Sequence, residues 1–175
     1  MKKSLLLVIV FLQTVNLFSQ KLKPERTDNM SGDKIKSTEP EYIFSTMNNQ
    51  YISAECIKTG EKNTSVVLRI STTNTVYMVS QGKPVILKLY NDSTMRLSPG
   101  ADVISKLGGG ISGNFGLIRY GVTIELRLSA KEKEVLKVQP IKLIRVYIDD
   151  VSEDYEMKSK NRSMVLKHLQ LLDKE

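Results

Sequence analysis

The stretch from Gly121 to Ile148 constrains the fold most, because three successive patterns in it have clear structural meanings. In its first part, apolar residues alternate with polar ones at four positions, Val122, Ile124, Leu126 and Leu128. This two-residue period predicts a strand with one buried face. Ser129 and Glu132 follow at the spacing of a capping box, which predicts a short helix that Pro140 ends.

The residues after Pro140 predict a second strand, Leu143–Ile148, with Ile144, Val146 and Ile148 on one face. Two arrangements are open for the strands on either side of the helix. They pair in parallel through a right-handed crossover, or they lie in different sheets because the helix is short. In both arrangements we expect their apolar faces to be part of the core and to stabilise the fold.

Upstream of this unit, turn residues separate short alternating runs about every eight to twelve residues. The runs are residues 42–47, 51–58, 65–71, 75–79, 85–90 and 94–97. This spacing is typical of an antiparallel β-sandwich or a curved sheet. We expect one helical turn at residues 102–107 and a C-terminal amphipathic helix capped by Ser159 or Asn161. The predicted fold is therefore mainly β (β-rich α+β), with a short inserted helix and a terminal helix.

The N-terminal residues predict export. Two lysines precede an unbroken apolar run, Leu5–Leu12, which is too short to span a bilayer. This pattern is typical of a secretory signal peptide, predicted here as residues 1–19 and followed by a polar, flexible lead-in at residues 20–40. Residues 41–175 are then one β-rich domain of a periplasmic or extracellular protein, and no transmembrane helix is expected.

Composition excludes several chemistries. The chain has one cysteine, Cys56, and one histidine, His168, so an intrachain disulfide and a multi-histidine zinc site are excluded. Cys56 is predicted to be a small core residue and His168 a packed residue beside the apolar stripe of the last helix, since no hydrolase motif accompanies either. The net charge is +7, but the lysines are scattered and nucleic acid is not an expected partner.

Acidic residues gather after the second strand of the central unit. Asp149, Asp150, Glu153 and Asp154 are the candidate metal ligands, and calcium is the ion that such carboxylates suit. The spacing of an EF-hand is absent, and the alternative is a solvated acidic turn over Asp149–Asp154. The sequence favours the turn, and it assigns no catalytic or cofactor-binding residue.

Gly108–Gly113 matches the pattern G-x-G-x-x-G. The dinucleotide-binding fingerprint requires a strand before this pattern and a helix after it. Residues 115–120 continue into a strand instead, so we expect a glycine loop between two strands.

The order of these elements resembles that of small exported bacterial proteins of unknown function. In those proteins a leader and a run of short strands precede a strand, a Ser-capped helix, an Ile-Arg-Val strand and a last helix. The corresponding unit here is Val122–Leu172, with Ile144, Arg145 and Val146 at its centre. The resemblance implies a β-rich exported domain and carries over no catalytic residue.

Three functions are compatible with the sequence. The first is an exported non-enzymatic binding or envelope-associated module, whose partner is a protein or glycan of the cell envelope. The second is an exported hydrolase whose site cannot be assembled from the sequence, and the third is a structural envelope protein. Exposed aromatic residues in a groove would favour the binding module. A cleft at which His168 or two of the acidic carboxylates converge would favour the hydrolase.

Overall fold

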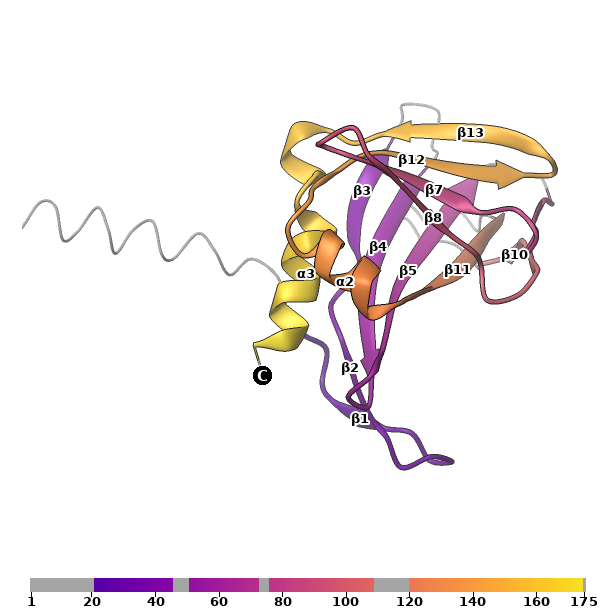
Figure 1. Cartoon of the computed structure of the whole chain (residues 1–175). Helices are drawn as coiled ribbons and strands as arrows, with labels where there is room; N and C mark the ends of the chain where they lie inside the picture. The colour runs from indigo at the N-terminus through magenta and orange to yellow at the C-terminus, as the bar shows by residue number, and fades with distance from the viewer. Residues whose placement is uncertain (1–20, 46–50, 73–75, 109–119, 175) are drawn as a thin grey trace, which may run out of the picture.

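The computed structural model describes residues 21–45, 51–72, 76–108 and 120–174. Most of these residues are in antiparallel strands, which form a large curved sheet, a four-stranded sheet and a two-stranded ribbon (Figure 1). This confirms the predicted β-rich fold with a short inserted helix and a C-terminal helix. The predicted signal peptide, residues 1–19, lies outside the described residues.

The large sheet has the strand order β1-β2-β4-β5-β11-β10, and β3 also pairs with β4. Its strands are β1 (Arg26–Thr27), β2 (Lys34–Ser37), β3 (Glu41–Ser45), β4 (Tyr51–Thr59), β5 (Asn63–Thr72), β10 (Lys106–Leu107) and β11 (Tyr120–Leu128). The long strands β4, β5 and β11 are paired along nearly their whole length. The apolar face predicted for each of these strands is confirmed, because Ile52, Leu68 and Ile124 are buried on the same side of the sheet.

The described part of the predicted flexible lead-in, residues 21–40, instead contributes the strands β1 and β2 to the large sheet. β1 and β2 pair as a hairpin, and β2 pairs with β4 from Ile35 to Ser37. The Lys23 N–H donates a hydrogen bond to the Ser37 carbonyl at 2.8 Å. The prediction is therefore wrong for these residues. A polar composition is compatible with an exposed hairpin, because strand pairing satisfies the main chain without burying the side chains.

The small sheet has the strand order β13-β12-β7-β8. Its strands are β7 (Val85–Leu89), β8 (Thr94–Leu97), β12 (Ile141–Ile148) and β13 (Val151–Glu156). The ribbon pairs β6 (Met78–Val79) with β9 (Val103–Ile104). Residues 102–107, predicted as a helical turn, therefore contribute to two short strands, β9 and β10, because β6 and β11 supply hydrogen-bonding partners from distant parts of the chain.

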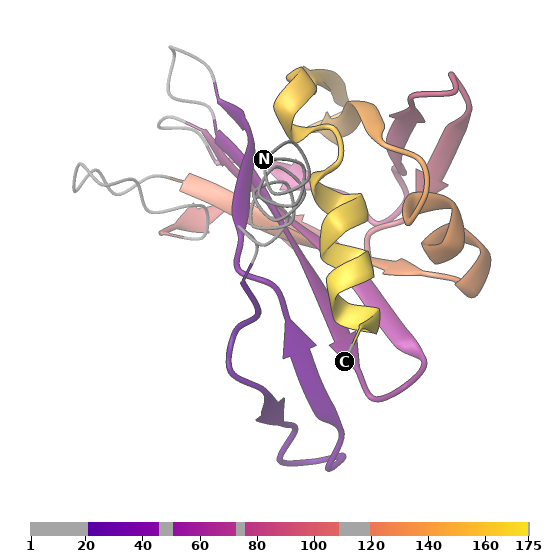
Figure 2. The same cartoon turned by 90° about the vertical axis from the view of Figure 1, so that its left-hand side faces the viewer.

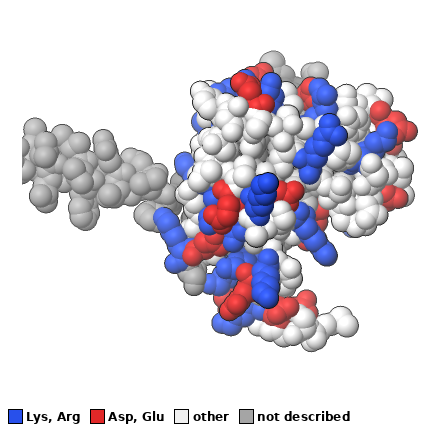
Figure 3. Space-filling view, in the orientation of Figure 1, with Lys and Arg blue, Asp and Glu red and all other residues white. Residues whose placement is uncertain are grey.

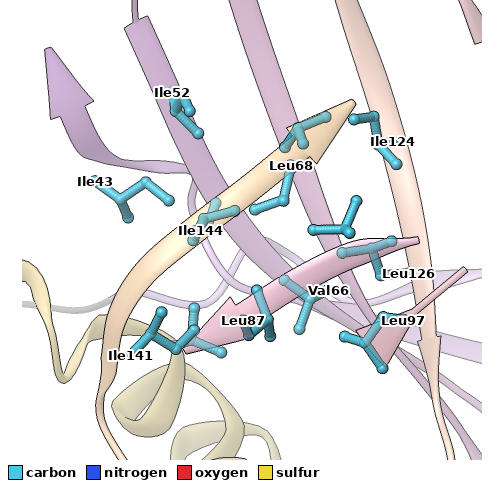
Figure 4. Packing of buried hydrophobic residues seen from close by; sticks show 14 of the residues in the cluster. Ile43, Ile52, Val66, Leu68, Leu87, Leu97, Ile124, Leu126, Ile141 and Ile144 are labelled. Atoms are coloured by element: carbon cyan, nitrogen blue, oxygen red, sulfur yellow. The ribbon is translucent and has the colours of Figure 1, made fainter. Parts of the chain in front are cut away.

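The core lies between the two sheets. Figure 4 shows Leu87 and Ile144 of the small sheet lying across Val66, Leu68 and Leu126 of the large sheet. β11 and β12, the two strands of the central unit, are thus in different sheets, which is the second of the two predicted arrangements. Removal of both apolar faces from water is the main stabilising term for such a packing.

The described residues also contain three helical segments: α2 (Ala130–Leu136), the 3₁₀ turn η1 (Ser159–Asn161) and α3 (Met164–Asp173). Figure 2 shows α3 running beside the large sheet, where it packs against β4, and the predicted apolar stripe of α3 is buried. The predicted cap is wrong, since the first residue before α3 is Ser163 and its side chain makes no cap bond. Asn161 donates instead to the Ile43 carbonyl at 3.0 Å. In the described part of the chain, none of the helices has the length and apolarity needed to cross a bilayer.

Candidate functional site: a groove beside an open strand edge

A groove of about 390 Å³ lies between β8 and α2. Leu89, Met95 and Val135 give it an apolar wall, and the exposed side chains of Arg96 and Lys131 also line it. Met95 and Val135 are half-buried and pack against the main core. A ligand in this groove would therefore meet apolar surface and positive charge together.

The turn between β7 and β8 holds β8 in place. Asn91 Oδ1 accepts hydrogen bonds from the N–H and the hydroxyl of Ser93 at 3.1 and 2.7 Å. Asp92 has a φ of 62°, and its N–H donates to the Leu89 carbonyl at 3.0 Å. The Leu89 N–H donates to the Ser93 carbonyl at 2.9 Å and closes a three-residue hairpin loop that ends in a left-handed residue. The tight turn predicted at residues 91–93 is confirmed.

β8 is the edge strand of the small sheet. Hydrogen-bonded and non-hydrogen-bonded residue pairs alternate along an antiparallel ladder. Because Leu89 and Ser93 form the hydrogen-bonded pair that closes the hairpin, the next such pair contains Met95. Thr94 and Arg96 therefore direct their main-chain N–H and C=O groups away from β7. Within the described residues, no strand pairs with this outer edge of β8.

The opposite side of the groove is fixed by the capping box of α2. Glu132 N–H donates to Ser129 Oγ at 3.3 Å, and Glu132 Oε2 accepts from the Ser129 N–H at 2.8 Å. The capping box predicted from the sequence is confirmed. It starts the helix directly after β11, so that Leu136 is buried in the core while Val135 faces the groove.

The charges that line the groove are mainly positive. Among the described residues, neither Arg96 nor Lys131 forms an ion pair, whereas the lining carboxylate, Glu132, is engaged in the capping box. Figure 3 shows Lys and Arg side chains over the region of β7 and β8, with both signs of charge around α2. An anionic group in the groove would therefore meet uncompensated cations.

The acidic side chain of the β7–β8 turn is already compensated. Asp92 Oδ1 lies 3.1 Å from Lys142 Nζ and 3.4 Å from Lys88 Nζ. Hydrogen bonds from these two lysines lower the pKa of Asp92. Asp92 therefore adds little repulsion toward an anion bound nearby.

Two other hollows in the surface are smaller than the groove. A hollow of about 140 Å³ is lined by Tyr42, Phe44, Lys158, Lys160 and Asn161. It has the exposed aromatic ring that favours a binding module, but it is below the usual range of about 300 to 1,000 Å³ for ligand pockets. A second hollow of about 290 Å³ is lined by Lys34, Lys36 and Lys58, and each of these lysines has a carboxylate partner.

The candidate metal ligands do not converge. Asp149 Oδ1 accepts from the Met78 N–H at 2.8 Å, and Asp150 pairs with Lys83 at 3.2 Å. Asp154 is held by Arg145 through two hydrogen bonds of 2.6 and 2.7 Å. Among the residues the structure describes, no three His, Cys, Asp or Glu side chains are placed to hold a metal ion.

The predicted acidic turn over Asp149–Asp154 is shorter than expected. Asp149 and Asp150 have φ angles of 46° and 68°, which form a two-residue hairpin loop of the I′ type. Glu153 and Asp154 lie on β13, opposite Val146 and Arg145. The length prediction fails because β12 offers hydrogen-bonding partners to these acidic residues, and pairing overrides their low strand propensity.

His168 lies in a buried chain of hydrogen bonds. The Cys56 N–H donates to Thr38 Oγ1 at 3.0 Å, and Thr38 Oγ1 lies 3.1 Å from His168 Nδ1. His168 Nε2 is 3.3 Å from Glu41 Oε1. Because a carboxylate can accept but not donate, the proton belongs on Nε2, and Nδ1 accepts from the Thr38 hydroxyl. Burial lowers the pKa of His168, against the opposing effect of Glu41.

The hydrogen bonds that link Thr38, His168 and Glu41 have the hydroxyl, imidazole and carboxylate order of a nucleophilic triad, which the sequence did not reveal. Thr38 and His168 are both 0% exposed, so neither the hydroxyl nor the imidazole meets solvent. Cys56 is also fully buried, and burial raises the pKa of its thiol. Cys56 is therefore a core residue, as predicted. The hydrogen bonds of His168 to Thr38 and Glu41 connect α3 to β3 and to the residue that follows β2.

A buried carboxylate on the outer face of the large sheet was also missed. Glu55 is 2% exposed and forms ion pairs with Lys23 and Arg69. The alternation in β4 predicts the Ser53 and Glu55 side as the solvent face, but both residues are buried. No pattern in the sequence pairs Glu55 with Lys23, because the contact depends on the ordered segment before β1.

Gly108, the first residue of the glycine loop, follows β10 directly and has a φ of 74°. The rest of that loop, residues 109–113, lies outside the described residues.

In comparisons with known proteins, no family model, curated protein or solved structure matches the chain.

Proposed function

We propose that this chain is an exported binding module and that the groove between β8 and α2 is its contact surface for a protein partner. The observation that supports this proposal is a strand edge that pairs with no other described strand and lies beside an apolar wall. Strand edges with free main-chain groups are a recurrent docking surface for extended segments of other proteins.

The hydrolase alternative has less support. Thr38, His168 and Glu41 have the order of a triad, but a substrate carbonyl has no path to a hydroxyl that is 0% exposed. The carboxylates after β12 each have a different partner, so they offer no pair for acid–base chemistry.

Export is the part of this proposal that depends on the sequence alone. The lysine pair and the apolar run Leu5–Leu12 support a cleaved leader. The intact mass of the protein recovered from its native host should lack about nineteen residues. Recovery of the uncut chain from the cytosol would contradict export and leave the groove proposal standing.

A selection experiment tests the groove. Peptides selected from a random library against the folded protein should shift the amide NMR signals of residues 93–97 and 129–135. The Val135→Glu variant places a charge on the apolar wall, so the selected peptides should bind it about tenfold more weakly or worse, a loss of about 1.4 kcal/mol.

The matched control is Val138→Glu, which changes an exposed valine just after the same helix. Its affinity for the selected peptides should equal that of the unchanged protein. Peptides that shift signals elsewhere, or that lose affinity equally in both variants, would overturn the groove as the contact surface.

A further inference from the structure

We infer that the partner segment is an extended acidic peptide that adds to β8 as a fifth strand of the small sheet. This inference rests on the proposed function and deepens it, because it names the binding mode and the chemistry of the ligand. Three observations carry it: the direction of the free main-chain groups, the apolar wall and the uncompensated charges.

The main chain of β8 offers two residues that can pair with an added strand. Thr94 and Arg96 are two residues apart, and each presents one N–H and one C=O to the outer edge. An extended segment presents matching groups at the same two-residue period. Four hydrogen bonds are therefore available to a peptide without any change in the sheet.

The side chains of β8 specify the pattern of that peptide. Met95 points toward the groove with Leu89 and Val135, whereas Thr94 and Arg96 are exposed. In a paired strand, the residue opposite Met95 would lie on the same side and enter the groove. Its two neighbours would lie on the outer face, so the pattern is polar, apolar, polar.

Charge selects acidic residues for the polar positions. Arg96 lies on β8 itself and Lys131 on the first turn of α2, and neither has an ion-pair partner among the described residues. Opposite charges across neighbouring strands attract, and like charges repel. A peptide of the form Glu-apolar-Glu places a carboxylate opposite Arg96, and Lys131 adds positive charge on the groove side, whereas Lys-apolar-Lys would be repelled.

A second copy of the chain is the competing occupant. β13 is the opposite edge of the small sheet, and it carries Glu153, Asp154 and Glu156. However, α2 borders the outer edge of β8, and a single extended peptide needs less room beside this helix than a folded sheet edge does. Sedimentation analysis at increasing protein concentration distinguishes the two occupants. A monomer is expected, and association of the β8 edge of one copy with the β13 edge of another would overturn the inference.

Two synthetic peptides provide the direct test, Ser-Glu-Leu-Glu-Leu-Glu-Ser and its counterpart with lysine in place of glutamate. The acidic peptide should bind at low salt, and the basic peptide should bind at least about tenfold more weakly. Binding of the acidic peptide should weaken as salt rises. N-methylation of its main chain on the bonding edge should abolish binding, because it removes the donors that strand addition requires.

Variants locate the interaction on the protein. Arg96→Glu should reverse the preference between the two peptides, whereas Arg127→Glu, an exposed arginine on β11, should leave it unchanged. Thr94→Pro removes one outward N–H and should weaken binding of the acidic peptide. Its control is Ser152→Pro at the edge of β13, where the hairpin register also turns the N–H outward.

The outcomes separate this inference from the proposed function. If peptides bind in the groove but the basic one binds equally well, or N-methylation has no effect, the inference fails and the groove remains a binding site. If no peptide shifts the signals of β8 and α2, both fail. The N-methylated peptide keeps the test decisive should Thr94→Pro prevent folding.

Discussion

At the scale of single residues, the structure places two ionisable groups where their burial has consequences. Glu55 is buried between Lys23 and Arg69 on the outer face of the large sheet. His168 is buried between Thr38 and Glu41 under α3. Neither group is exposed to a ligand, so both are expected to affect the stability of the fold rather than binding.

Glu55→Gln should destabilise the protein. The change removes the carboxylate from two charge-assisted hydrogen bonds, each of a kind that contributes about 1.5 to 3 kcal/mol. Since Lys23 and Arg69 are partly exposed and can be solvated in the variant, we expect a loss of about 2 kcal/mol in the free energy of unfolding. Urea denaturation measures it. Glu61→Gln, at an exposed position in the β4–β5 turn, should change the same quantity by less than about 0.5 kcal/mol.

His168 should make stability fall in mild acid. Its pKa is lowered in the folded state from the ordinary value of 6.5, so below that pH the unfolded chain binds more protons than the folded chain. The contribution of neutral His168 is complete above pH 6.5 and decreases as the pH falls toward the folded pKa, by at most about 1.4 kcal/mol per pH unit.

The measurement is the free energy of unfolding between pH 7.5 and 5 for the unchanged protein and for His168→Gln. The variant should show a shallower slope, because the titrating imidazole is gone while Glu41 and Glu55 remain. Parallel slopes in the two proteins would show that His168 is not the group responsible.

At the scale of elements, α2 and the β12–β13 hairpin show how particular residues stabilise a short helix and a tight turn. α2 has seven residues, too few to be stable as an isolated helix. Its capping box and the burial of Leu136 compensate for this short length. The hairpin depends instead on two consecutive residues with left-handed φ angles, which aspartate adopts more readily than most residues.

Ser129→Ala should lower stability by about 1 kcal/mol, the usual effect of removing a helix cap. Thermal unfolding measures the change as a decrease in Tm. Ser163→Ala is the matched control, since Ser163 precedes α3 without a side-chain cap bond. Equal decreases in the two variants would mean that the capping box contributes nothing specific.

Calcium should leave the Tm nearly unchanged at millimolar concentrations. Asp149, Asp150 and Asp154 each have a different partner, so the acidic hairpin offers no common ligand sphere. A saturable increase in Tm, lost in Asp150→Asn, would instead show a calcium site, because an ion that binds the folded state alone stabilises it by mass action.

At the scale of the whole molecule, the two sheets share one apolar cluster with both helices. Ile124 is in the large sheet and Ile144 in the small sheet, and both are 0% exposed. Because each sheet covers the apolar face of the other, we expect neither sheet to persist alone.

Ile124→Ala and Ile144→Ala should each lower the free energy of unfolding by about 2 to 5 kcal/mol, the range for truncating a buried aliphatic side chain. Val151→Ala, at an exposed position on β13, is the control and should have almost no effect. Far-UV circular dichroism and tyrosine fluorescence should follow one common transition in both core variants. Separate transitions would contradict the shared core.

The sequence alone was sufficient for features that depend on neighbours within a few residues. The apolar faces of β4, β5, β7 and β11, the turn at residues 91–93 and the capping box at Ser129 were all predicted correctly. In each case the cause is local, since a period of two residues or a side chain three residues away decides the structure. The short strands β9 and β10 escaped prediction because their partners come from elsewhere in the chain.

The tertiary structure decided which elements meet, and with that the candidate site. Periodicity shows that β8 is a strand and α2 a helix, but it does not show that they face each other across a groove. Likewise, Thr38 and Glu41 are about 130 residues from His168, and Glu55 meets Lys23 from a segment predicted to be flexible. Such contacts result from the packing of the two sheets and of α3, and packing energy depends on surfaces that are far apart in sequence.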